Sequence, residues 1–96
     1  MTVEYQRSDR YVYRHVAGEH LLISLQRTTV TPMCTLTVTG AEVWIGLADW
    51  MTRDALVDML TAAFEVDRVQ ADDDVDEFLR QLGDMNALNT READSR

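Results

Sequence analysis

The amino-acid sequence predicts an α+β domain in which a three-stranded antiparallel sheet is followed by three helices. Two observations indicate this fold class: residues 11–38 contain three short runs rich in β-branched and aromatic residues, whereas residues 39–88 carry apolar residues at helical spacing. A chain of 96 residues is long enough for one domain. Three strands and three short helices in this length suggest a winged-helix-like arrangement.

The strands are expected in the N-terminal half. Residues 11–16 (YVYRHV) and 21–25 (LLISL) are separated by a short gap that contains a glycine, which is typical of a hairpin. Pro32 favours an extended backbone before it and is tolerated at the start of a strand, which predicts a third strand at 33–38. The polar link at 26–31 is long enough for a homodimer that exchanges the hairpin.

The helices are expected in the C-terminal half. Thr39 and Glu42 fit a capping box that opens the first helix, and Thr52 is expected to cap the second. Three consecutive aspartates, residues 72–74, are expected to open the third helix, because the helix macrodipole favours anions at that end. The apolar stripe of this third helix consists of Val75, Phe78, Leu79, Leu82 and Met85.

The two ends of the chain are polar and show no periodicity. Residues 1–9 and 89–96 are therefore expected to be flexible tails around a domain that spans residues 10–88. No internal repeat or linker divides this domain.

The charge of the chain excludes several classes of partner. Nine basic residues, all arginine, stand against seventeen acidic ones, giving a net charge of −8. Nucleic-acid backbones and anionic membranes both attract clustered lysine and arginine, so neither is an expected partner. No apolar run approaches the roughly 18 residues of a membrane span, and no signal peptide opens the chain. We therefore expect a cytoplasmic protein.

The sequence offers no convincing active site. His15 and His20 flank the hairpin turn and can approach each other, but two imidazoles make a poor metal site without a third ligand. Cys34, the one cysteine, has no recognisable histidine partner and is expected simply to pack. The acidic run 72–77 does not match a calcium loop. We expect no cofactor, no metal and no enzymatic activity.

The charge of the third helix distinguishes between the binding functions that remain possible. A winged-helix protein would offer this helix to a DNA groove, but here a single Arg80 faces six acidic residues, so nucleic-acid binding is a minor alternative. The acidic helix could instead serve a general protein-interaction domain that docks a basic partner. This second alternative stays open.

The third strand has the composition of an unprotected edge. Residues 28–41 contain no charge, although natural edge strands are usually protected by charge, proline or bulges. An extended peptide can add to such an edge, with backbone hydrogen bonds giving affinity and side-chain pockets giving specificity. The alternative is a central strand, or one covered by the chain's own tail. Alternation divides the strand into one face with Cys34, Leu36 and Val38 and another with Met33, Thr35 and Thr37.

Three segments in order resemble one known family. Residues 36–47 (LTVTGAEVWIGL) resemble the strand-to-helix segment of the PqqD-like proteins. Residues 52–66 (TRDALVDMLTAAFEV) and 72–88 (DDDVDEFLRQLGDMNAL) resemble the second and third helices of that family. The resemblance extends over residues 10–88.

This resemblance implies a function. PqqD-like domains bind the leader of a ribosomally made precursor peptide and present its core to a modifying enzyme, often a radical SAM protein, without catalysis of their own. The leader adds as a further strand to the third strand, against the third helix. The expected peptide-binding residues are Met33, Cys34, Thr35, Leu36 and Thr37 on the strand and Val75, Asp76, Leu79 and Arg80 on the helix.

Overall fold

The computed structural model describes residues 2–26 and 33–93, and its central feature is the predicted antiparallel sheet. Strands β2 (Tyr11–Val16), β3 (Glu19–Ser24) and β4 (Met33–Leu36) pair in the order β2–β3–β4. A tight turn joins β2 to β3, and there Ala17 and Gly18 both adopt positive φ. The predicted hairpin and third strand are therefore confirmed, but the third strand ends at Leu36 instead of residue 38, because Thr37 caps the following helix and Val38 is its first residue.

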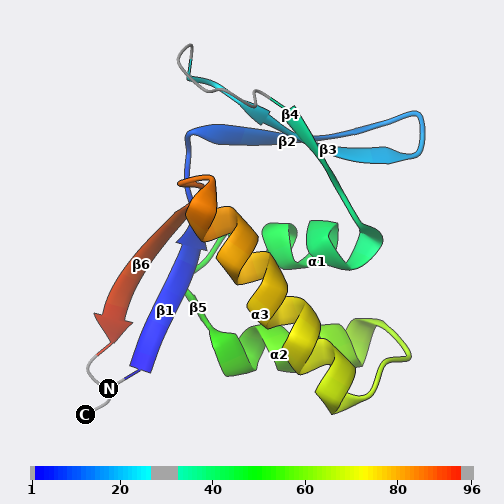
Figure 1. Cartoon of the computed structure of the whole chain (residues 1–96). Helices are drawn as coiled ribbons and strands as arrows, with labels where there is room; N and C mark the ends of the chain where they lie inside the picture. The colour runs from blue at the N-terminus through cyan, green and yellow to red at the C-terminus, as the bar shows by residue number, and fades with distance from the viewer. Residues whose placement is uncertain (1, 27–32, 94–96) are drawn as a thin grey trace.

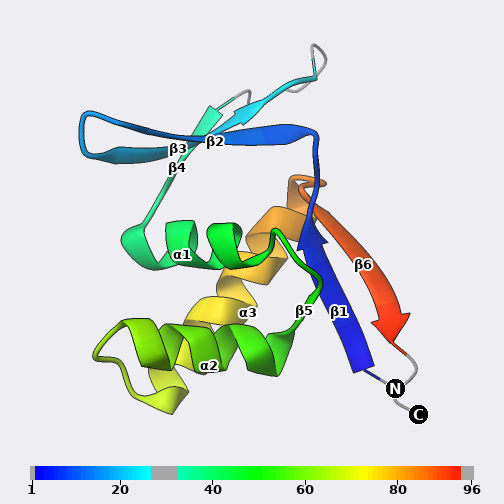
Figure 2. The same ribbon diagram turned by 180° about the vertical axis from the view of Figure 1, so that it is seen from behind.

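Three helices lie on one side of this sheet (Figures 1 and 2). They are α1 (Val38–Gly46), α2 (Arg53–Ala63) and α3 (Arg68–Asp84). In Figure 1, α3 crosses in front of α1 and α2. The predicted α+β fold class, a three-stranded sheet followed by three helices, is confirmed.

Two of the three predicted helix starts are wrong, although each helix exists. Thr52 does cap α2, because its hydroxyl accepts from the Ala55 amide at 3.1 Å. The cap of α1 is Thr37 rather than Thr39, because the Thr37 hydroxyl accepts from the Gly40 amide at 3.0 Å. The cap of α3 is Asp67, whose carboxylate accepts from the Gln70 amide at 2.8 Å. The aspartates at 72–74 therefore lie inside α3, one turn after its start.

The expectation of flexible tails is also wrong for the described ends. Residues Thr2–Arg7 form β1, and residues Leu88–Ala93 form β6. These strands pair in an antiparallel register from Thr2 opposite Ala93 to Arg7 opposite Leu88, and the two-residue β5 (Met51–Thr52) pairs with β1. The long-range pairing supplies the hydrogen bonds that the polar sequences do not provide locally.

A single core holds the sheet against the helices. Trp44 is 1% exposed, as its place on the α1 stripe predicts, and Leu22 from the central strand is fully buried beneath the helices. The corner between β1 and β2 is fixed by Ser8, whose amide donates to the Ala87 carbonyl at 2.8 Å. The other fully enclosed large side chains are Val43, Leu47, Leu56, Val57, Leu60, Val75 and Leu82.

Three expectations lie wholly or partly outside the described residues. The polar link that suggested an exchanged dimer falls almost entirely within residues 27–32, as does Pro32 at the expected start of the third strand. The last three residues of the expected C-terminal tail, 94–96, also lie outside.

Candidate functional site

Strand β4 is an open edge of its sheet. Within residues 2–26 and 33–93 it pairs only with β3. Opposite residues of an antiparallel pair alternate between those that exchange hydrogen bonds and those that exchange none. The Leu25 amide donates to the Arg10 carbonyl at 2.8 Å, which fixes this alternation across the whole sheet. Cys34 and Leu36 consequently bond to β3, while the main-chain groups of Met33 and Thr35 point outward from the edge.

A groove runs beside this open edge, between β4 and the C-terminal half of α3. Its volume is about 300 Å³, which is within the range of a site for a small ligand or a peptide side chain. Met85, the C-cap residue that follows α3, is half-buried at one end of the groove. The lining consists of Cys34, Thr35 and Leu36 from the strand and Phe78, Gln81, Leu82, Asp84 and Met85 from the helix.

The groove is apolar with one charged side chain. Leu36 and Leu82 are buried in its floor, while Asp84 is exposed and has no ion-pair partner among the described residues. Burial raises the pKa of the Cys34 thiol, so that this side chain is neutral at pH 7 and adds to the apolar character. Such a surface suits an apolar side chain with a cation next to it.

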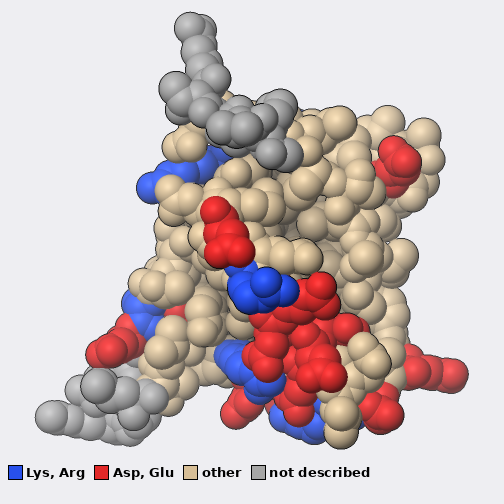
Figure 3. All heavy atoms as spheres, in the orientation of Figure 1, with Lys and Arg blue, Asp and Glu red and all other residues tan. Residues whose placement is uncertain are grey.

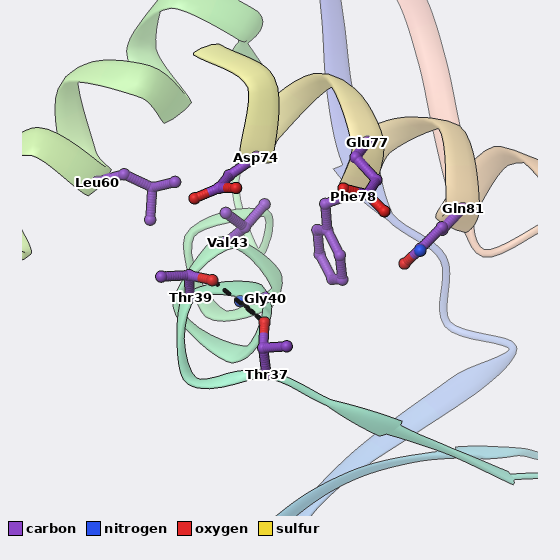
Figure 4. A pocket seen from close by; sticks show the side chains of 9 residues that line it. All are labelled: Thr37, Thr39, Gly40, Val43, Leu60, Asp74, Glu77, Phe78 and Gln81. Carbon is purple, nitrogen blue, oxygen red and sulfur yellow. Dashed lines mark hydrogen bonds between the residues drawn. The ribbon is translucent and has the colours of Figure 1, made fainter. Parts of the chain in front are cut away.

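A second hollow of about 170 Å³ adjoins the groove at the start of α1 (Figure 4). It shares Phe78 and Gln81 with the groove, and Figure 4 shows the Phe78 ring between Glu77 and Gly40. A side chain at Gly40 would meet this ring at 3.0 Å, so the glycine allows α1 and α3 to approach closely. Together the two hollows follow α3 from Asp74 to Met85.

Most of the predicted strand residues meet at the groove. Cys34, Thr35 and Leu36 line it, and Met33, which is 53% exposed, precedes them on the open edge. Thr37 lines the adjoining hollow.

The four predicted helix residues do not line the groove. Val75 and Leu79 are buried in the core, and Arg80 is exposed elsewhere on α3. Asp76 forms an ion pair with Arg53 of α2, in which the guanidinium donates to both carboxylate oxygens. This hydrogen bonding holds the pKa of Asp76 below its usual range. Asp76 therefore stabilises the contact between α2 and α3.

The helical wall of the groove consists of residues other than the four predicted ones. Phe78, Leu82 and Met85 belong to the predicted apolar stripe and were expected only in the core. Gln81 and Asp84 lie beside this stripe, at spacings that bring them onto the same side of the helix. The stripe itself was the available signal, but its division between core and groove depends on how α3 packs on β4.

The two histidines do approach each other, as predicted. His15 and His20 are cross-strand neighbours with stacked rings whose centroids are 4.3 Å apart. The Tyr13 hydroxyl lies 2.6 Å from Nδ1 of His20. Among the described residues, no three side chains of the His, Cys, Asp or Glu type converge as metal ligands. No helix in the described ranges is long and apolar enough to cross a membrane.

Comparisons with known proteins bear on the whole domain. The family model described as coenzyme PQQ synthesis protein D (PqqD) matches residues 19–88. A solved structure of TbiB1 in complex with the TbiA(beta) leader peptide is 30% identical in sequence, with a TM-score of 0.71. That match covers 93% of this chain and 99% of TbiB1, whereas no curated protein sequence matches the chain. The family model spans more than half of the chain, and the protein therefore belongs to the PqqD family.

Proposed function

We propose that this protein is a non-catalytic adaptor that binds the leader of a ribosomally made precursor peptide and presents it to a modifying enzyme. The observation that carries the proposal is the open edge of β4 beside an apolar groove. The similarity to TbiB1, which was solved with a leader peptide, supports it.

In this proposal the leader adds to the sheet as a fourth strand. Its backbone pairs with the outward main-chain groups of Met33 and Thr35, and every second side chain enters the groove against Phe78 and Leu82. Backbone pairing provides affinity for many sequences, whereas the groove selects apolar side chains at fixed positions. Thr37 continues the path toward the adjoining hollow.

The charges around the groove indicate the kind of leader. No arginine lines either hollow, whereas Asp74, Glu77 and Asp84 all do. These three carboxylates form no ion pair with a described residue, and they favour a basic ligand, because opposite charges attract and like charges are repelled. We therefore expect the leader to carry apolar anchors with arginine or lysine beside them.

The predicted residues Val75, Asp76, Leu79 and Arg80 have an indirect role in this proposal. Val75 and Leu79 fix α3 against the core, and Asp76 ties it to α2 through Arg53. These contacts hold the wall of the groove at its distance from β4. Arg80 adds a positive charge on the exposed side of α3.

The partner that receives the peptide is proposed to be a separate modifying enzyme in the cytoplasm, with a radical SAM protein as the first candidate. The alternative of a general docking face for a basic protein has one observation in its favour, the acidic side chains gathered over α2 and α3 (Figure 3). However, Arg53 and Arg68 already pair with Asp58, Asp72 and Asp76 on this face. The groove explains more of the surface than the acidic face does.

The proposal is tested by titrating fluorescent leader peptides against the purified protein. The probes are the TbiA(beta) leader peptide and the leader of any short precursor whose gene is found beside the gene of this protein. Asp84→Lys should weaken binding of a basic leader by about threefold to tenfold, because a rim charge contributes on the order of 1 kcal/mol. Asp49→Lys, an exposed change outside both hollows, is the matched control. Failure of every leader to bind would refute the proposal.

A further inference from the structure

A second groove lies along the opposite edge of the sheet. It has a volume of about 640 Å³ and shares no lining residue with the groove beside β4. Figure 2 views the molecule from this side, where β1, β2 and α1 stand in front of α3. The lining consists of Gln6, Arg7, Ser8, Asp9, Tyr11, Val12, Tyr13, Arg14, Trp44, Ala48 and Asn89.

Strand β2 is open along this groove. Within the described ranges it pairs only with β3, and the hydrogen-bond alternation of the sheet assigns Val12 and Arg14 to that pairing. The main-chain groups of Tyr11, Tyr13 and His15 therefore point away from β3. This alternation leaves the Tyr13 amide out of the pairing with β3, whereas the Tyr13 carbonyl accepts from the Arg14 guanidinium at 3.0 Å. The edge can accept an extended segment just as the β4 edge can.

Two arginines line this groove, and neither forms an ion pair with a described carboxylate, as is also true of Arg10 and Arg80 elsewhere on the molecule. Arg53, Arg68 and Arg91 each form an ion pair, whereas no described carboxylate lies within ion-pair distance of Arg7 or Arg14. Arg7 donates to the Trp44 carbonyl at 3.4 Å, with its guanidinium 5.9 Å from the indole ring centre. Arg14 donates only to the carbonyl of its neighbour Tyr13. Against these two cations the groove holds a single carboxylate, Asp9.

We propose that this second groove binds an extended acidic segment of the modifying enzyme, which adds to β2 and places its carboxylates on Arg7 and Arg14. The inference rests on the proposed adaptor function, since an adaptor needs a second surface that stays free while the leader is bound. Charge complementarity selects the occupant: in a chain of net charge −8, an acidic segment is repelled from the acidic hollows along α3 and attracted here. The two edges thereby sort two partners by charge.

The experiment follows backbone amide signals by NMR while synthetic peptides are added to the full, ¹⁵N-labelled chain. One probe alternates glutamate and valine, and its counterpart carries lysine in place of every glutamate. The glutamate peptide should shift the amides of Tyr11, Tyr13 and His15, and Arg14→Glu should weaken its binding by about threefold to tenfold. Arg68→Glu, which makes the same charge change on α3, should alter the affinity by less than twofold.

Several outcomes would overturn the inference. These are equal binding of the lysine peptide, shifts centred on Met33 and Thr35 instead of β2, or no shift at millimolar peptide. Concentration-dependent shifts of the β2 amides without any peptide would assign the edge to a second copy of the chain. A leader titration of the same samples separates the two proposals, because the leader can bind β4 whether or not the acidic peptide binds β2.

Discussion

Replacing Thr35 by proline tests the pairing of a leader with β4 directly. Thr35 lies on the open edge with its amide pointing outward, opposite Leu21, so that the substitution removes no hydrogen bond between β3 and β4. An edge strand tolerates proline at such a position, and the preceding Cys34 is already extended. The variant should therefore stay folded.

The expected loss of affinity follows from one missing donor. A leader carbonyl that would accept from the Thr35 amide faces the proline ring instead, and an unsatisfied polar group in such an interface costs about 1–3 kcal/mol. At 1.4 kcal/mol for each factor of ten, the dissociation constant should rise by about 5- to 150-fold.

Fluorescence anisotropy with a labelled leader measures this change, after circular dichroism has confirmed the fold of each variant. Arg91→Ala is the control, because Arg91 lies on β6, contacts Glu4 and Trp50, and lines neither the groove nor the adjoining hollow. If folded Thr35→Pro protein binds the leader as tightly as this control, the peptide does not pair with β4 and the reasoning is refuted.

Three further predictions concern stability and the groove. Leu22→Ala should lower the free energy of unfolding by about 2–5 kcal/mol in urea denaturation, because the fully buried side chain leaves a cavity; a loss under about 1 kcal/mol would contradict the assigned core. Arg53→Gln should cost about 1 kcal/mol or less at pH 7, because its ion pairs are exposed. Since Arg53 lowers the pKa of Asp76 in the folded protein, this difference should be fully present above the ordinary carboxyl pKa of about 3.9 and be lost as the pH falls through the lowered pKa of Asp76. Unfolding curves whose separation does not shrink as the pH falls toward about 2 would disprove the link. Iodoacetamide should alkylate Cys34 slowly at pH 7, because burial raises the pKa of the thiol, and a bound leader should slow it further; unchanged kinetics with saturating leader would place the peptide elsewhere.

Local signals in the sequence were sufficient for the sheet and the helices, but less so for their ends. Thr37 and Thr39 are equivalent as caps when only residue type and spacing are known. In the structure the Gly40 amide donates to the Thr37 hydroxyl, so that Thr37 is the cap. Asp67, the cap of α3, likewise precedes the three aspartates at which this helix was expected to begin. These errors move a boundary without changing an element.

The misjudged tails have a different cause. Val3 and Tyr5 are the only apolar residues of β1, which is too short an alternation to indicate a strand, and the partner strand β6 lies at the other end of the sequence. Their pairing depends on the whole domain having brought the ends together. The helical wall of the groove was missed for a related reason: periodicity indicates that Phe78 and Leu82 face inward, whereas the position of α3 decides that they also face β4.

The pairing of β1 with β6 makes the main chain almost a closed ring. Thr2 stands opposite Ala93 in the register, and main chains of paired strands lie about 5 Å apart. A short glycine linker between these positions could join them, and new termini could be opened at the exposed turn around Gly18. If the two positions are joined and no new termini are opened, the cyclic chain has less entropy in the unfolded state, by up to about 4–5 kcal/mol for a loop near 100 residues. The same geometry would let this domain be inserted into a surface loop of another protein with little change to either fold.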